Sequence, residues 1–215
     1  TVTVDATPTI TATANFKSCP GHTVPLTASG AGSGGSYTWM PGSLSGATVN
    51  VSPTTTTTYT VTGTTSAGCP NTKNVIVYAE NVATDGNRDI CFGKSTTLKG
   101  SKADSYSWSP GGSTSANNTV SPTTTTTYTV TGSNTAGGGC TTSTTVTVTV
   151  NPLPSVTAST TNATIYDGDD VTISAAGNAN TWTWMPMNLV QQNITFAPSV
   201  TQTYTVTGKL TATGC

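Results

Sequence analysis

The stretch SPTTTTTYTVTG at residues 52–63 recurs unchanged at residues 121–132 and returns as APSVTQTYTVTG at residues 197–208. Each copy is preceded by a tryptophan with a proline two residues after it. Each copy is followed by a Gly-Cys pair. Self-similarity at a period of about 70 residues is typical of tandem domains. The chain is therefore predicted to contain three copies of one unit. The tryptophans and the closing cysteines are Trp39, Trp108 and Trp184, and Cys69, Cys140 and Cys215.

The composition around these copies favours β-structure throughout. Threonine and valine are abundant, and β-branched side chains suit a pleated sheet. Short alternating segments are bounded by Gly, Pro, Ser and Asn, which is typical of an all-β sandwich. For the first unit we expect strands at 9–14, 23–28, 37–40, 47–52, 58–64 and 74–78, with a short strand near 43–45.

Charge and hydropathy exclude several classes of function. Charged residues make up 7% of the chain and the formal net charge is −1, so no basic surface is expected to hold nucleic acid. No run of about 20 apolar residues predicts a membrane span. No signal peptide opens the chain, so we expect a mature or excised segment of a secreted protein.

Aromatic residues recur at matching places in the three units. A sandwich of about 70 residues is near the lower size limit for a self-sufficient core, so large buried side chains matter. A sugar-binding face that includes Tyr37, Tyr106 and Trp182 is the alternative use of such aromatics, and Phe92 and Tyr166 are candidates for exposed contacts. The expected core residues are Trp39, Tyr59, Trp108, Tyr128, Trp184 and Tyr204.

The order Cys-x-Gly, Tyr-x-Trp-x-Pro, Thr-Thr-Tyr-Thr-Val-Thr, Gly-Cys resembles the Ig-like and PKD-like repeats of secreted Bacteroidetes surface proteins. That group includes gliding-motility adhesins exported by the type IX route. The resemblance implies three tandem immunoglobulin-like antiparallel β-sandwiches at the cell surface, associated with the outer membrane or part of an extracellular filament. The core disulfide of many immunoglobulin domains is missing, and Val24 and Val61 stand roughly in its place.

The repeat bounds predict four segments. Residues 1–7 are the last strand of a preceding repeat with its linker, because TVTV at 1–4 matches TVTV at 147–150. Repeats then span 8–80, 81–153 and 154–215, the last of them without its final strand. Two interpretations stay open. The chain is either a window on a longer continuous array, or a filament subunit in which residues 1–5 of one copy complete the third repeat of another.

The five cysteines are expected to form disulfides in an oxidising compartment. Cys19 precedes the second strand, and Cys69 follows the sixth. In a seven-strand sandwich these points lie at opposite ends, about 20 Å apart, whereas disulfide-bonded Cα atoms lie within about 7 Å. We therefore favour the inter-repeat pairs Cys19–Cys140 and Cys91–Cys215. If the strand near 43–45 does not form, the within-repeat pairs Cys19–Cys69 and Cys91–Cys140 become the expected ones.

Two acidic clusters are weak candidates for a Ca²⁺ site, because hard cations prefer oxygen ligands. Polar turns rich in Asp and Gly are the alternative, and no cofactor is expected. The chain has one histidine, His22, and lacks a Gly-x-Ser-x-Gly elbow and a phosphate-binding loop, so we predict no enzymatic activity. The candidate ligands are Asp85, Asp89, Asp167, Asp169 and Asp170.

The expected function is therefore structural or adhesive. We predict a semi-rigid stalk in a large bacterial surface adhesin or extracellular filament. The alternatives are a strand-donating filament subunit, and a spacer or carbohydrate-binding repeat of a secreted multidomain enzyme. The expected partners are neighbouring repeats of the same or another copy, and surface glycans or a host or substratum surface.

Overall fold

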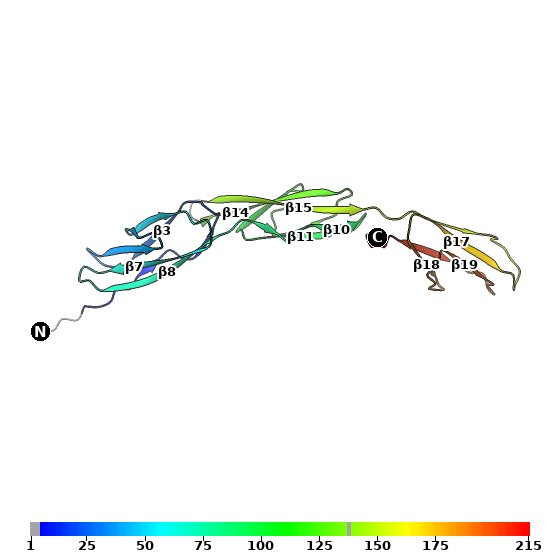
Figure 1. The fold of residues 1–215 in the computed structure, drawn as a ribbon, viewed down its shortest axis with the longest axis horizontal. Helices are drawn as coiled ribbons and strands as arrows, with labels where there is room; N and C mark the ends of the chain where they lie inside the picture. Colours follow the sequence, from blue (N-terminus) through cyan, green and yellow to red (C-terminus); the bar gives the residue numbers. More distant parts are fainter. Residues whose placement is uncertain (1–4, 137–138) are drawn as a thin grey trace. The chain divides into compact units, whose positions relative to one another are not determined.

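The computed structural model describes residues 5–136 and 139–215. Within these ranges the chain forms strands and turns but no α-helix, and no helix is long and apolar enough to cross a membrane. The strands build three immunoglobulin-like sandwiches, made by β1–β8, β9–β15 and β16–β20 (Figure 1). Residues 1–4, the greater part of the predicted donor segment, lie outside the described residues.

The first sandwich has one sheet of three strands and one of five. The first sheet has the order β1-β3-β6: Thr11–Ala12, Val24–Ser29 and Thr48–Val51. The second has the order β2-β8-β7-β4-β5: Phe16–Ser18, Pro70–Ala79, Thr57–Thr64, Ser36–Met40 and Leu44–Ser45. Buried and exposed residues alternate along β3, as expected when one face of a sheet packs on the core.

Two details of the predicted strands are wrong. The segment 9–14 is not one strand, because the chain leaves the first sheet after β1 and joins the second as β2. There β2 runs parallel to β8, so the sandwich is not purely antiparallel. The short strand predicted near 43–45 does form, as β5, and it pairs with β4. The switch between sheets has a local cause, since the Asn15 side chain accepts a hydrogen bond (2.8 Å) from the backbone N–H of Ile76 in β8.

The second sandwich repeats this arrangement. Its first sheet has the order β13-β11-β9: Asn117–Val120, Thr96–Ser101 and Ala83–Thr84. Its second has the order β10-β15-β14-β12: Arg88–Cys91, Cys140–Asn151, Thr126–Asn134 and Ser105–Ser109. Again one pair, β10 with β15, is parallel.

The third sandwich has five strands among the described residues. One sheet has the order β16-β17-β19: Val156–Thr160, Val171–Gly177 and Asn193–Phe196. The other is the pair β18-β20: Thr181–Met185 and Thr205–Lys209. No described strand pairs with the free edge of β20, whereas β7 and β14 each lie between two neighbours.

The glycine that ends the YTVTG motif has the same packing role in all three sandwiches. Its missing Cβ leaves room for an apolar side chain from the beginning of the repeat, and a Cβ would overlap that side chain. The glycines and their neighbours are Gly63 with Ile10, Gly132 with Val82, and Gly208 with Val156. Close approach therefore accounts for glycine at this place in each strand.

The chain divides into two compact units that do not coincide with the repeats. The first comprises 1–86, 97–118 and 128–146, and the second comprises 87–96, 119–127 and 147–215. One disulfide lies within each unit.

Candidate functional site

Two disulfides link the repeats, and three of their four cysteines lie at or next to a strand end. Cys19 follows β2 directly and is joined to Cys140, the first residue of β15, with their Cα atoms 6.0 Å apart. Cys91, the last residue of β10, is joined to Cys215 with a Cα separation of 5.5 Å. Each disulfide thus joins one sandwich to the next sandwich along the chain. The second cysteine of each pair follows the YTVTG motif of that next sandwich. Cys69 has a free thiol.

We expected the cysteines of one repeat to lie at opposite ends of its sandwich only if a short strand forms near residues 43–45. The second sandwich shows that the strand is not needed. In the second sandwich no separate strand lies between β12 and β13. A tight turn reverses the chain there: Trp108 N–H donates to Ser113 O (2.8 Å) and Gly112 N–H donates to Trp108 O (2.9 Å). This turn therefore reverses the chain between β12 and β13, as a short strand was expected to do.

Polar contacts join residues of the first and second repeats within the first compact unit. The Lys17 ammonium donates to the carbonyl of Ala103 (3.2 Å) and lies 3.7 Å from Asp104 Oδ1. Lys102 Nζ lies 3.5 Å from Glu80 Oε1. These ion pairs are partly exposed and contribute little individually. They add to the link that the Cys19–Cys140 disulfide makes between the two repeats.

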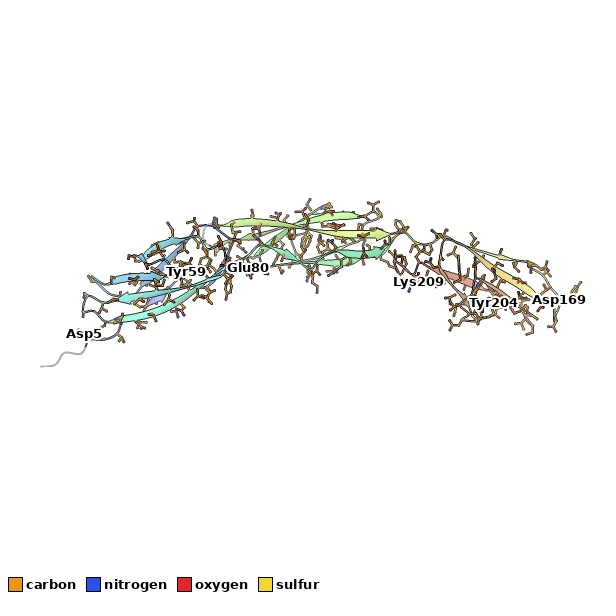
Figure 2. The ribbon with its side chains drawn as sticks, in the orientation of Figure 1. Asp5, Tyr59, Glu80, Asp169, Tyr204 and Lys209 are labelled. Atoms are coloured by element: carbon orange, nitrogen blue, oxygen red, sulfur yellow. A yellow bond between two sulfur atoms is a disulfide. The ribbon has the colours of Figure 1, made fainter. Side chains whose placement is uncertain are left out.

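The acidic candidates are spread over turns and edges. Asp85 Oδ1 accepts a hydrogen bond from Lys99 N–H (3.2 Å). Asp169, in the loop between β16 and β17 (Figure 2), accepts one from Tyr166 N–H (3.2 Å). Asp89, Asp167 and Asp170 are exposed. Over residues 5–136 and 139–215 no three His, Cys, Asp or Glu side chains gather in a group that could hold a metal ion.

The tryptophans are core residues whose polar atoms are used internally. Trp39, Trp108 and Trp184 are at most 1% exposed, and each indole N–H donates to the backbone carbonyl seven residues later. The Tyr37 and Tyr106 hydroxyls bond to the backbone of their own turns. Trp182 is buried as well, at 7% exposed, and Tyr37 and Tyr106 are half-buried, so the predicted set does not form one exposed aromatic face. Among the described residues the exposed aromatics are Tyr78 (38%), Phe92 (50%) and Tyr166 (86%).

The tyrosines of the YTVTG motif differ between repeats. Tyr59 and Tyr128 are buried, and burial raises the pKa of both phenols. Tyr204 is only half-buried and packs its ring against Phe196 at a centroid distance of 5.0 Å (Figure 2). The prediction that Tyr204 is a core residue equivalent to the other two is therefore only partly right.

A cavity of about 670 Å³ lies beside Tyr204 in the third sandwich. It is lined by the loop residues 162–167, by residues 198–202 with Tyr204, and by the core residues Val171, Ile173 and Trp184. None of the predicted site residues was assigned to a groove at this place, although Tyr166, Asp167 and Tyr204 line it.

Comparison with known proteins gives only distant likenesses. The chain matches no known protein family and no curated protein. Among solved structures, DIP-gamma Ig1+Ig2 aligns at 12% identity and a TM-score of 0.31, covering 69% of this chain and 99% of that one. The Ig1-2 module of the Drosophila receptor protein tyrosine phosphatase DLAR aligns at 10% identity and a TM-score of 0.30, covering 68% and 100%.

A third likeness is to SGBP-B of a Bacteroides ovatus mixed-linkage glucan utilization locus, solved with a mixed-linkage heptasaccharide. It aligns at 18% identity and a TM-score of 0.27, covering 98% of this chain and 66% of that one. At such low scores these likenesses identify no ligand. The immunoglobulin-like fold rests on the strand order of the chain itself.

Proposed function

We propose that this chain is a non-catalytic, load-bearing stalk segment of an extracellular surface adhesin or filament. The observation that carries the proposal is the pair of long-range disulfides, Cys19–Cys140 and Cys91–Cys215. Disulfides persist in oxidising compartments, which supports an extracellular location. The resemblance of the repeats to secreted Bacteroidetes repeats supports a gliding-motility adhesin exported by the type IX route as the finer form of the proposal.

The disulfides shorten the covalent path along which force would travel. From Asp5 the shortest path runs to Cys19, crosses to Cys140, returns along the second sandwich to Cys91 and crosses to Cys215. That path has about 65 steps, against about 210 along the backbone, and each extended residue spans about 3.5 Å. Most of the first and third repeats is therefore shielded from tension, which suits a stalk.

Single-molecule pulling tests this role. With handles at both ends, the oxidised chain should reach a contour length of about 65 residues, near 230 Å, while the reduced chain should extend about threefold further. The variant Cys19→Ser with Cys140→Ser should show an intermediate length, and Cys69→Ser should match the unmodified chain. An oxidised chain that extends as far as the reduced one contradicts the proposal.

A further inference from the structure

The turn that leads from β6 into β7 has the same sequence as the turn that leads from β13 into β14. Residues 52–63 and 121–132 are identical, and the turns form the first part of each range. The turns that connect other strands of these two sandwiches differ. They are GAGSGG at 30–35 against KAD at 102–104, and GSLS at 42–45 against GGST at 111–114. Surface turns tolerate substitution, so the identity of this one turn requires an explanation specific to its residues.

Five threonines of these turns have exposed side chains with free hydroxyl groups. We call them the turn threonines: Thr54, Thr55, Thr56, Thr123 and Thr124. Within residues 5–136 and 139–215 no hydrogen bond engages any of these hydroxyls. The turns therefore present reactive oxygen atoms to solvent that the folded chain does not itself use.

Threonines at the centre of a sheet are in a different situation. The Thr60 hydroxyl on β7 donates to Asn74 Oδ1 on β8 (2.9 Å), and Thr131 Oγ1 on β14 lies 2.8 Å from Ser143 Oγ on β15. Both threonines are half-buried, and each lies on a strand with a neighbour on either side. The turn threonines are therefore more accessible to an outside molecule than these two.

The fold uses the hydroxyl of the threonine that ends each turn. Thr57 Oγ1 donates to the Thr55 carbonyl (2.8 Å), and Thr126 Oγ1 donates to the Thr124 carbonyl (2.7 Å). These bonds close the turns at the first residue of β7 and of β14. For the residues before them, the types that favour turns are Gly, Pro, Asn, Asp and Ser, whereas β-branched threonine favours strands. Neither packing nor turn chemistry therefore accounts for the turn threonines.

We propose that the turn threonines carry O-linked sugars. Segments rich in threonine and serine with proline are typical of O-glycosylated stalks, and Pro53 and Pro122 directly precede the turn threonines. In the transfer, the threonine Oγ bonds to the anomeric carbon of a sugar diphosphate donor. The bond from that carbon to the diphosphate breaks, and the hydroxyl proton passes to a base of the transferase. Neither the disulfides nor the load-bearing role depends on these sugars.

Sugars at these turns compensate for the low charge of the surface. Charged residues make up 7% of the chain, and residues 52–63 and 121–132 contain none. Charged side chains ordinarily keep a protein surface hydrated and oppose association of copies. Sugars supply the same hydration without charge, and they do so at the same place in two successive sandwiches.

Mass spectrometry of the protein purified from the organism that makes it tests the proposal. After reduction, trypsin cleaves at lysine and arginine and places the two turns in separate peptides, 18–73 and 103–209. Both peptides should be heavier than their sequences by whole sugar residues, and electron-transfer fragmentation should locate the sugars on the turn threonines. Unmodified peptides, a mass increase that corresponds to phosphate, or sugars on Thr60 and Thr131 as often as on the turn threonines overturns the proposal.

Substitution of the first turn, in the same organism, tests the assigned sites. Thr54→Val with Thr55→Val and Thr56→Val nearly keeps the shape of each side chain and removes its hydroxyl. Peptide 18–73 should then lose its sugars while peptide 103–209 keeps them. The matched control Thr58→Val removes an exposed hydroxyl from β7 and should leave both peptides modified. Sugars retained on peptide 18–73 of the triple variant, lost from both of its peptides, or lost from the control overturn the assignment.

Discussion

At the scale of single residues, the tryptophan of each repeat ties the core to the turn that follows it. The indole N–H donates to Gly46 O (3.1 Å), Ser115 O (2.9 Å) and Gln191 O (3.1 Å) in the three sandwiches. The ring fills the centre of the sandwich while its one polar atom satisfies a carbonyl in the turn. This double role explains why the Trp-x-Pro motif marks each repeat so clearly in the sequence.

Trp108→Phe should lower the free energy of unfolding by about 2–4 kcal/mol, because it leaves a cavity and an unpaired Ser115 carbonyl. Urea denaturation followed by circular dichroism measures the change. Ser107→Ala, on the exposed face of the same strand, should change stability by no more than about 0.5 kcal/mol. Equal effects of the two substitutions would contradict the assigned role of Trp108.

The buried tyrosines predict a loss of stability at alkaline pH. Burial raises the pKa of Tyr59 and Tyr128 above the ordinary value of 10.0, so the folded state holds these protons more tightly than the unfolded state. The stabilisation is complete below pH 10 and falls as pH rises through the folded-state pKa. Denaturation midpoints measured from pH 8 to 12 should decline above about pH 10. In Tyr59→Phe with Tyr128→Phe the decline should be smaller, and an unchanged decline would assign it to other groups.

At the scale of elements, one asparagine controls how the first strand of a repeat changes sheets. Asn15 and Asn87 occupy matching positions, and each side-chain carbonyl accepts a 2.8 Å hydrogen bond from a backbone N–H of the last strand, at Ile76 and Thr147 respectively. The chain then continues as β2 or β10, parallel to that strand.

Asn87→Ala should therefore destabilise the edge formed by β10 and β15, at a cost of about 1–2 kcal/mol for the unpaired Thr147 amide. Hydrogen exchange at Thr147 should accelerate. Asn87→Asp keeps an acceptor oxygen at the same place and should retain most of the protection. Equal exchange in all three proteins would show that the side chain does not hold this edge.

The places of most strands along the chain and the core tryptophans were predictable from the sequence, because alternation and tryptophan spacing are direct consequences of a two-faced sheet. The sheet switch was not, since it depends on a single side chain at a bend. Asn87 lies in the sequence between the candidate calcium ligands Asp85 and Asp89, and only its hydrogen bond from the Thr147 N–H identifies it as a residue that caps a strand edge. Exposure at Tyr204 was also hidden, because the motif around it is the same as in the other repeats.

At the scale of the whole molecule, the disulfides determine which parts of the chain stabilise one another. Non-reducing peptide mapping should give peptides that join Cys19 to Cys140 and Cys91 to Cys215, with Cys69 open to alkylation. A peptide joining Cys19 to Cys69 would restore the within-repeat pairing and remove the shortened covalent path.

Removal of one disulfide should increase hydrogen exchange in the two repeats that it joins and leave the remaining repeat unchanged. Each disulfide closes a loop of more than 100 residues, which in the chain-entropy account contributes about 4–5 kcal/mol. Cys19→Ser with Cys140→Ser should increase hydrogen exchange in β2 and β15, and Cys91→Ser with Cys215→Ser should do so in β10 and β20. Cys69→Ser is the control and should leave the exchange pattern unchanged. If either double variant loosens only one sandwich, the repeats are stabilised separately and the disulfides serve only to limit extension.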